Sequence, residues 1–131
     1  MGIKPGFVIF VATLAIGSIF LPSPSSAADK AVVVVMTDLP PRFVPHTLKV
    51  AMNTIVEWKN TGNMLHGVST VLNDAQNKKD VHLPPGAKPF RSGFIMRGQT
   101  WKHRFSVPGH YTYFCLSHEK DGMVGKINVT R

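Results

Sequence analysis

The sequence predicts an all-β protein, either a β-sandwich or a β-barrel. About seven or eight short runs are rich in β-branched and aromatic residues, and in most of them apolar and polar residues alternate. Turn signals such as Pro40-Pro41 and Pro108-Gly109 separate the runs at short intervals. No amphipathic helical pattern extends beyond about two turns. Short alternating strands with frequent turns are typical of sandwiches and barrels.

Eight segments account for the predicted strands. They are residues 31–37, 43–50, 55–59, 68–72, 90–95, 100–105, 111–115 and 126–129. The alternation is clearest in 100–105, where aromatic and histidine side chains share one face and Lys and Arg share the other. Residues 73–90 are polar and rich in Asn, Asp, Lys and Pro. We expect them to form a long surface excursion with a helical turn around Ala75–Lys79.

The N-terminal segment has the three parts of a secretory signal peptide. Lys4 supplies a positive charge, residues 7–21 form a nearly unbroken apolar run, and small residues follow up to Ala28. The cleavage site fits equally well after Ala27 or Ala28. An uncleaved membrane anchor is the competing interpretation, but the run is shorter than the ~20 residues that span a bilayer. We therefore expect cleavage and no stable membrane insertion.

These boundaries divide the chain into a signal peptide, residues 1–28, and one mature domain, residues 29–131. The sequence has no cysteine near the cleavage site, so we do not expect a lipoprotein anchor. No twin arginine precedes the apolar run, so we expect export by the general secretory route. Any metal would then be loaded after export. We expect a periplasmic protein, with a thylakoid-type lumen as the alternative.

The chain is strongly basic, with a formal net charge of +8, and cleavage removes only the charge of Lys4. Such a balance suggests an acidic partner: a protein patch, anionic lipid or nucleic acid. Nucleic acid is disfavoured by export and by the lack of a basic run with interleaved aromatic residues. Improved solubility alone is the alternative explanation of the charge.

The only cysteine of the sequence, Cys115, begins a Cys-x2-His-x4-Met spacing that continues with His118 and Met123. A lone cysteine in an exported chain cannot form an internal disulfide, so this thiol needs another explanation. A nucleophile would require a base and an oxyanion hole, and no local signature supports either. Because Cys115 ends a predicted strand, the loop that leaves it can present thiolate, imidazole and thioether groups to one point.

A fourth ligand must come from elsewhere, and His66, after the loop that follows the 55–59 strand, is the best candidate. Two imidazoles, a thiolate and a thioether form a soft, mixed donor set that suits copper. Zinc could bind the same set, although structural zinc sites rarely use methionine. We therefore predict a metal site of His66, Cys115, His118 and Met123, with copper as the metal.

The same residues stand in a wider pattern that resembles the cupredoxins, the small type 1 blue copper proteins. The resemblance spans about residues 43–129 and is greatest to the plastocyanin and pseudoazurin branch, which has the same four-residue gap before the methionine. The pattern is Phe43-x-Pro45, Leu48-x-Val50, Val56-x-Trp58-x-Asn60, His66, then Pro108-Gly109-x-Tyr111-x-Tyr113-x-Cys115-x-x-His118-x-x-x-Gly122-Met123-x-Gly125-x-Ile127-x-Val129.

The resemblance implies a Greek-key β-sandwich of seven to eight strands with one type 1 copper at one pole. It implies that His66, Cys115 and His118 lie in the copper plane, that Met123 is axial, and that electrons pass through the surface edge of His118. The implied function is one-electron transfer, the copper cycling between Cu(I) and Cu(II), and not an enzymatic activity. We expect a soluble monomer that docks on donor and acceptor proteins with acidic patches.

Three positions depart from the family pattern. Gly67 stands where the family usually has an Asn whose side chain ties the two ligand loops together, so Gly67 can supply a backbone N–H to the thiolate but no tie. Ser117 stands where plastocyanin and pseudoazurin usually have Pro. Phe114 replaces the surface Tyr of plant plastocyanins, which argues against a plant-type photosynthetic partner.

Several other residues are not expected to bind the metal. Met64 is a rival thioether and the Leu65 carbonyl a rival axial ligand, but we expect both residues to form an apolar rim around His118. We expect Glu119, Lys120 and Asp121 at the surface of the ligand loop. The remaining histidines are expected to have no role in the metal site: His46, His82, His103 and His110.

One other function class stays open for such a chain, whereas copper enzymes and a dinuclear copper centre are not expected. A copper-delivery protein in copper homeostasis is the alternative function; it would have similar ligands in an open site, but the Met- or His-rich tails that would favour it are absent from the sequence. Copper enzymes such as nitrite reductases and multicopper oxidases need further domains and paired copper motifs, which we do not expect the single mature domain, residues 29–131, to hold. A dinuclear electron-transfer centre needs two cysteines.

Overall fold

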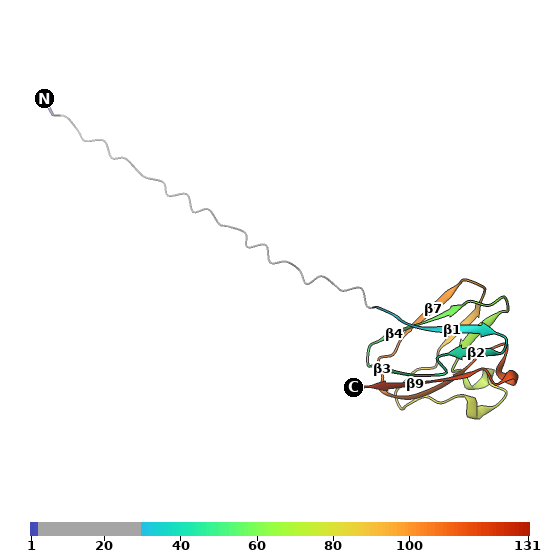
Figure 1. The fold of residues 1–131 in the computed structure, drawn as a ribbon. Coiled ribbons are helices and arrows are strands. Elements are labelled where there is room, and N and C mark those ends of the chain that lie inside the picture. Colours follow the sequence, from blue (N-terminus) through green and yellow to red (C-terminus); the bar gives the residue numbers. More distant parts are fainter. Residues whose placement is uncertain (3–29) are drawn as a thin grey trace.

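The computed structural model describes Met1, Gly2 and residues 30–131, and residues 30–131 form the folded domain of Figure 1. The predicted signal peptide, residues 1–28, lies almost entirely outside the described residues. Among the residues that are described, no helix is long and apolar enough to cross a membrane.

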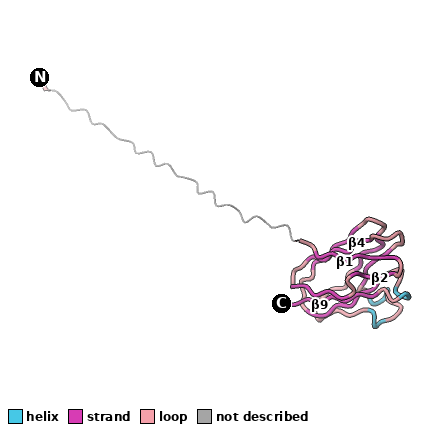
Figure 2. The backbone as a smooth tube through the Cα atoms, in the orientation of Figure 1, coloured by secondary structure: helices cyan, strands magenta, loops and turns pink. Residues whose placement is uncertain are grey.

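The described part of the chain contains nine strands in two sheets (Figures 1 and 2). The strands are β1 (Val32–Asp38), β2 (Pro41–Val44), β3 (Thr47–Ala51), β4 (Ile55–Asn60), β5 (His66–Ser69), β6 (Arg91–Ile95), β7 (Thr100–Arg104), β8 (Gly109–Phe114) and β9 (Val124–Thr130). One sheet has the order β2-β1-β4-β7 and the other β3-β9-β8-β5-β6. The β1–β4 and β3–β9 pairs are parallel and the rest antiparallel. The predicted all-β Greek-key sandwich is confirmed.

The strand count differs from the expected seven or eight because the predicted strand 43–50 is two strands. Its first part, β2, pairs with β1 in the four-stranded sheet, and its second part, β3, pairs with β9 in the other sheet. Pro45 lies between them and has no backbone N–H to donate to a ladder. The chain therefore leaves one sheet at Pro45 and enters the other at Thr47.

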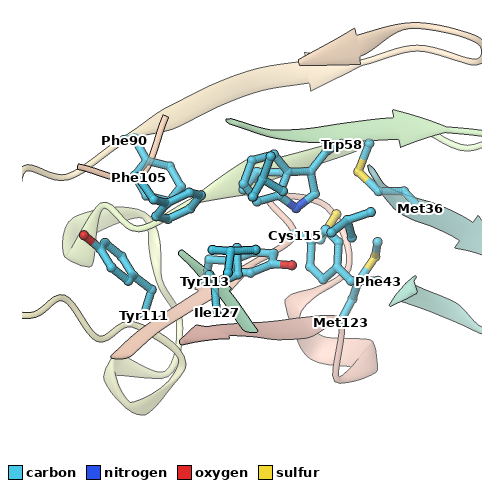
Figure 3. Packing of buried hydrophobic residues seen from close by; sticks show 14 of the residues in the cluster. Met36, Phe43, Trp58, Phe90, Phe105, Tyr111, Tyr113, Cys115, Met123 and Ile127 are labelled. Carbon is cyan, nitrogen blue, oxygen red and sulfur yellow. The ribbon is translucent and has the colours of Figure 1, made fainter. Parts of the chain in front are cut away.

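Side chains from both sheets interlock in a core that reaches the predicted metal site. Trp58 of β4 is fully buried and meets Tyr113 of β8 edge to face, with ring centroids 5.4 Å apart. Phe43 also packs against Tyr113, with ring centroids 4.7 Å apart. Figure 3 shows this aromatic core continuing to Cys115 and Met123, which lie together at one end of it.

The excursion between β5 and β6 runs beside β8 and pairs with it at one point. It contains two short 3-10 helices, η1 (Leu72–Asp74) and η2 (Lys78–Asp80), in place of the helical turn expected around Ala75–Lys79. His82 forms an isolated bridge to Thr112 of β8. Phe114, also on β8, is fully buried. Phe114 therefore does not present an aromatic ring at the surface, where the family pattern has a Tyr.

Candidate metal centre

Three of the four predicted ligands meet at one pole of the sandwich. Cys115 directly follows β8, His66 begins β5, and His118 lies just before the 3-10 helix η3 (Glu119–Asp121). The Cys115 Sγ atom is 3.7 Å from the Nδ1 atom of His66 and 3.7 Å from the Nδ1 atom of His118. The three potential ligand atoms all lie within 4.8 Å of one another. Two ring nitrogens thus face one sulfur, as a trigonal His2Cys site requires.

Met123 lies fully buried beside this cluster, at the start of the chain that returns into β9 (Figure 3). Gly122 before it adopts a left-handed conformation, with φ of 78°, which turns the loop back toward the core. Two backbone hydrogen bonds then fix Met123: its carbonyl accepts from Cys115 N at 2.9 Å and its N–H donates to His118 O at 3.1 Å. The rival thioether, Met64, is 42% exposed.

The donor set fits one type 1 copper. Cys115 and His66 are fully buried, so the thiol and the first imidazole are removed from water. The Gly67 N–H donates to the Cys115 Sγ atom at 3.4 Å, as the sequence led us to expect. A buried thiolate needs such compensation, which a bound cation would complete.

Asp38, which sequence reasoning missed, orients His66 from the end of β1. Its Oδ1 atom lies 2.9 Å from the Nε2 atom of His66. A carboxylate there holds the proton on Nε2 and leaves Nδ1 free to bind a metal. The Asp38 carboxylate also accepts from the N–H groups of Asn63 and Met64. These hydrogen bonds, with that of Asn63 the main cause and that of His66 next, lower the pKa of Asp38.

Asn60 shapes the loop between β4 and His66 and was present in the sequence pattern without an assigned role. Its fully buried side chain donates to the carbonyls of Met64 and Ile95, each at 2.8 Å, and accepts from Gly62 N at 2.9 Å. Gly62 is needed because a Cβ atom there would lie 1.8 Å from Asp38 Oδ1. The loop that precedes His66 is thus fixed from both sides.

His118 is the only one of the four predicted ligands that is not fully buried. Its ring centroid lies 4.8 Å from that of His66. Burial lowers the pKa of His118 below its usual value, and the neighbouring His66 lowers it further. The hydroxyl of Ser117 lies 3.0 Å from the His118 Nδ1 atom and 3.5 Å from the Cys115 Sγ atom.

Exposed apolar side chains gather on the segments that flank this pole. We call them the apolar rim: Met64, Leu65, Phe94 and Met96. Met64 and Leu65 directly precede His66, as predicted. Phe94 is the cross-strand partner of Gly67, and Met96 follows the partner of His66. Sequence reasoning missed Phe94 and Met96 because only the β5–β6 pairing brings them here.

The position of Glu119 differs from the one expected from the sequence. We expected it at the loop surface, and Lys120 and Asp121 are indeed exposed. Glu119, however, is only 7% exposed, and its carboxylate accepts from Gln76 N at 2.9 Å and Asn77 N at 2.8 Å. It therefore joins the ligand loop to the excursion between η1 and η2. Its partners are backbone groups of an irregular segment, which no side-chain pattern reveals.

The other histidines lie outside the ligand cluster. His46, His82 and His110 are exposed. His103 is partly buried in the core edge, stacked on Trp101 at 5.8 Å between ring centroids and packed against Phe90 at 4.2 Å. Burial lowers its pKa. That these four histidines have no role in the metal site stays a prediction.

Known proteins are similar to this chain in sequence and in fold. The family model of copper-binding proteins of the plastocyanin/azurin family matches residues 30–130. Plastocyanin of Vicia faba is 25% identical over 87 residues, covering 66% of this chain and 86% of that protein. The chloroplastic plastocyanin of Chlamydomonas reinhardtii is 30% identical over 95 residues, covering 66% and 57%. The match covers only 51% of the length of the Arabidopsis thaliana and Pisum sativum plastocyanins.

Solved structures of copper proteins are similar to this chain in fold. A reduced mutant of amicyanin superposes with a TM-score of 0.60 and 25% identity, covering 80% of this chain and 87% of that chain. A purple cupredoxin from Nitrosopumilus maritimus, 23% identical, has a TM-score of 0.56 and covers 77% and 100%. A copper-containing nitrite reductase from Thermus scotoductus matches 78% of this chain but only 23% of its own, with a TM-score of 0.58. The chain belongs to the copper-binding plastocyanin/azurin family, the cupredoxins.

Proposed function

We propose that this cupredoxin is an extracytoplasmic one-electron carrier whose type 1 copper is bound by His66, Cys115, His118 and Met123. The observation that supports it most is the pair of imidazole Nδ1 atoms, each 3.7 Å from the buried Cys115 Sγ atom. Bound there, copper would exchange one electron between Cu(I) and Cu(II) with little rearrangement, because this donor geometry lies between the preferences of the two states.

Hydrogen bonds among the protein residues support that geometry. Asp38 orients His66, the Gly67 N–H compensates the thiolate, and the Cys115 N–H to Met123 carbonyl bond closes the ligand loop. Such fixed positions favour electron transfer, which needs a constant site, over copper delivery, which needs an open one. Burial of Cys115, His66 and Met123 supports the same choice.

His118 is the proposed point of electron exit, since its partly exposed ring lies at the pole that the apolar rim flanks. A desolvated apolar contact would let a partner approach closely. The basic chain would steer partners with acidic patches, raising the encounter rate at low salt. We therefore expect the rate of electron transfer with the physiological partner to fall as ionic strength rises.

Localisation and enzymatic status follow the same proposal. The signal-like segment, residues 1–28, supports export to the periplasm and cleavage to residues 29–131. The match to 23% of a nitrite reductase chain concerns the shared fold, and the described residues here contain one His/Cys cluster that could bind a metal, that of His66, Cys115 and His118. We propose a monomeric carrier and no enzymatic activity of its own.

Electron self-exchange of the copper-loaded protein, measured by NMR line broadening between the Cu(I) and Cu(II) forms, tests this proposal. A carrier should show fast self-exchange and a reversible one-electron wave at an electrode. Met123→Leu should shift that potential, and Met64→Leu, at the rival thioether, should leave it unchanged. An irreversible wave, or copper lost within one reduction cycle, would indicate a delivery protein instead.

A further inference from the structure

We propose that the Ser117 hydroxyl is the tie that holds the two ligand-bearing loops together, in place of a side chain at position 67. The Ser117 Oγ atom donates to the Leu65 carbonyl at 2.6 Å, across a sequence separation of 52 residues. Leu65 directly precedes His66, and Ser117 directly precedes His118. A single hydrogen bond therefore connects the backbones next to the two imidazoles.

Position 67 has no room for a side chain that could connect the two loops. A Cβ atom on Gly67 would lie 2.7 Å from the Gly93 carbonyl oxygen and 2.8 Å from the Leu116 Cδ1 atom. The oxygen belongs to the backbone of the neighbouring strand β6 and cannot move aside cheaply. Leu116 thus fills the space that a longer residue at position 67 would need, so the connection must come from the 115–118 side.

The other polar contacts between these loops in the described chain all use the Cys115 sulfur. They are those of the Gly67 N–H at 3.4 Å and His66 Nδ1 at 3.7 Å. Both depend on the state of the thiol, whereas the Ser117–Leu65 bond does not. The Ser117–Leu65 bond is therefore the one polar connection between these loops, in the described chain, that does not involve the Cys115 sulfur.

The hydroxyl has a single proton, and the 2.6 Å bond commits it to the Leu65 carbonyl. The Ser117 Oγ atom also lies 3.0 Å from the His118 Nδ1 atom and 3.5 Å from the Cys115 Sγ atom. Ser117 acts as a positioning residue: it fixes the distance between the two loops. This role rests on the proposed copper site, but the hydrogen bond itself involves none of the four proposed ligand side chains.

Amide hydrogen exchange of the metal-free protein tests the tie without copper. In Ser117→Ala we expect the Met64 and Gly67 amides to exchange about three- to tenfold faster, the factor for one lost net hydrogen bond. Ser117→Thr keeps the hydroxyl and should restore the wild-type rates. Ser106→Ala, an exposed serine in the turn after β7, is the matched control and should exchange as wild type.

The copper-loaded forms supply the second readout. In Ser117→Ala the relative intensities of the thiolate-to-copper bands should change, and in Ser117→Thr they should return to the wild-type ratio. Exchange and spectra of Ser117→Ala identical to wild type would overturn the tie. The same would follow if Ser117→Thr behaved as Ser117→Ala. A wild-type protein with no blue band at all would instead contradict the copper proposal, whatever the exchange rates show.

Discussion

The Asp38 carboxylate, 2.9 Å from the His66 Nε2 atom, fixes the side of the imidazole that faces Cys115. These residues are 28 positions apart, and the parallel pairing of β1 with β4 brings them together: Met36 opposes Asn60, so both strands end at the same pole. The orientation of His66 thus depends on β1, the first strand of the domain, which ends 28 positions earlier in the sequence.

Removing this carboxylate should weaken metal binding. In Asp38→Ala the His66 ring loses its acceptor, and we expect copper affinity to fall about 10- to 100-fold, the usual effect of losing a ligand's hydrogen-bond partner. Competition with a chelator measures it. Asp38→Asn retains an oxygen that can accept from Nε2, so its affinity should lie near wild type. Equal loss in both variants would show that charge, not orientation, is the contribution of Asp38.

The buried carboxylate of Glu119 should stabilise the whole ligand end of the domain. In Glu119→Ala the N–H groups of Gln76 and Asn77 lose their acceptor, and we expect the free energy of unfolding to fall by about 1.5–3 kcal/mol. Urea unfolding of the metal-free protein measures this. Asp121→Ala, an exposed acidic residue on the same loop, should change stability by less than about 0.5 kcal/mol.

His103 should make metal-free stability depend on pH. Burial lowers its pKa below 6.5 in the folded protein, so between that lowered value and 6.5 the unfolded chain binds a proton that the folded chain does not. Stability is therefore fully present above pH 6.5 and declines as pH falls toward the folded pKa. Unfolding curves at several pH values should show this slope reduced in His103→Gln. An unchanged slope would contradict the effect; His46→Gln, at an exposed site, is the control.

The apolar rim should control electron exchange without tuning the copper. Phe94 is 62% exposed, so Phe94→Lys should fold normally and leave the reduction potential unchanged. It should slow self-exchange on the order of tenfold at low salt, since two like charges must then approach. Leu72→Lys, 49% exposed on η1, adds the same charge elsewhere and is the control. Equal slowing in both variants would assign the effect to net charge and remove the rim from the mechanism.

The ligand loop shows how far sequence reasoning reaches. The alternation of Tyr111 to Cys115 predicted the strand, and the spacing to His118 and Met123 predicted side chains that the structure brings to one pole. These features are local, because a strand and its exit loop are written in one stretch of sequence. Copper ligation by these residues stays a prediction that metal-binding experiments must test.

Non-local features could not be derived in this way. The division at Pro45 depends on which sheet each half joins, and the position of Asp38 depends on the β1–β4 pairing. Ser117 could be noted as unusual, but its acceptor is a backbone carbonyl 52 residues away. Backbone partners carry no side-chain signature, so their positions become known only from the folded chain.

The visible spectrum of the purified domain with Cu(II) tests the central claim, a type 1 copper on the Cys115 thiolate. We predict an intense blue thiolate-to-copper band in the wild type and in Met64→Leu, and its complete loss in Cys115→Ser. A pale, weakly absorbing copper complex in the wild type, or a blue band that survives Cys115→Ser, would contradict the account.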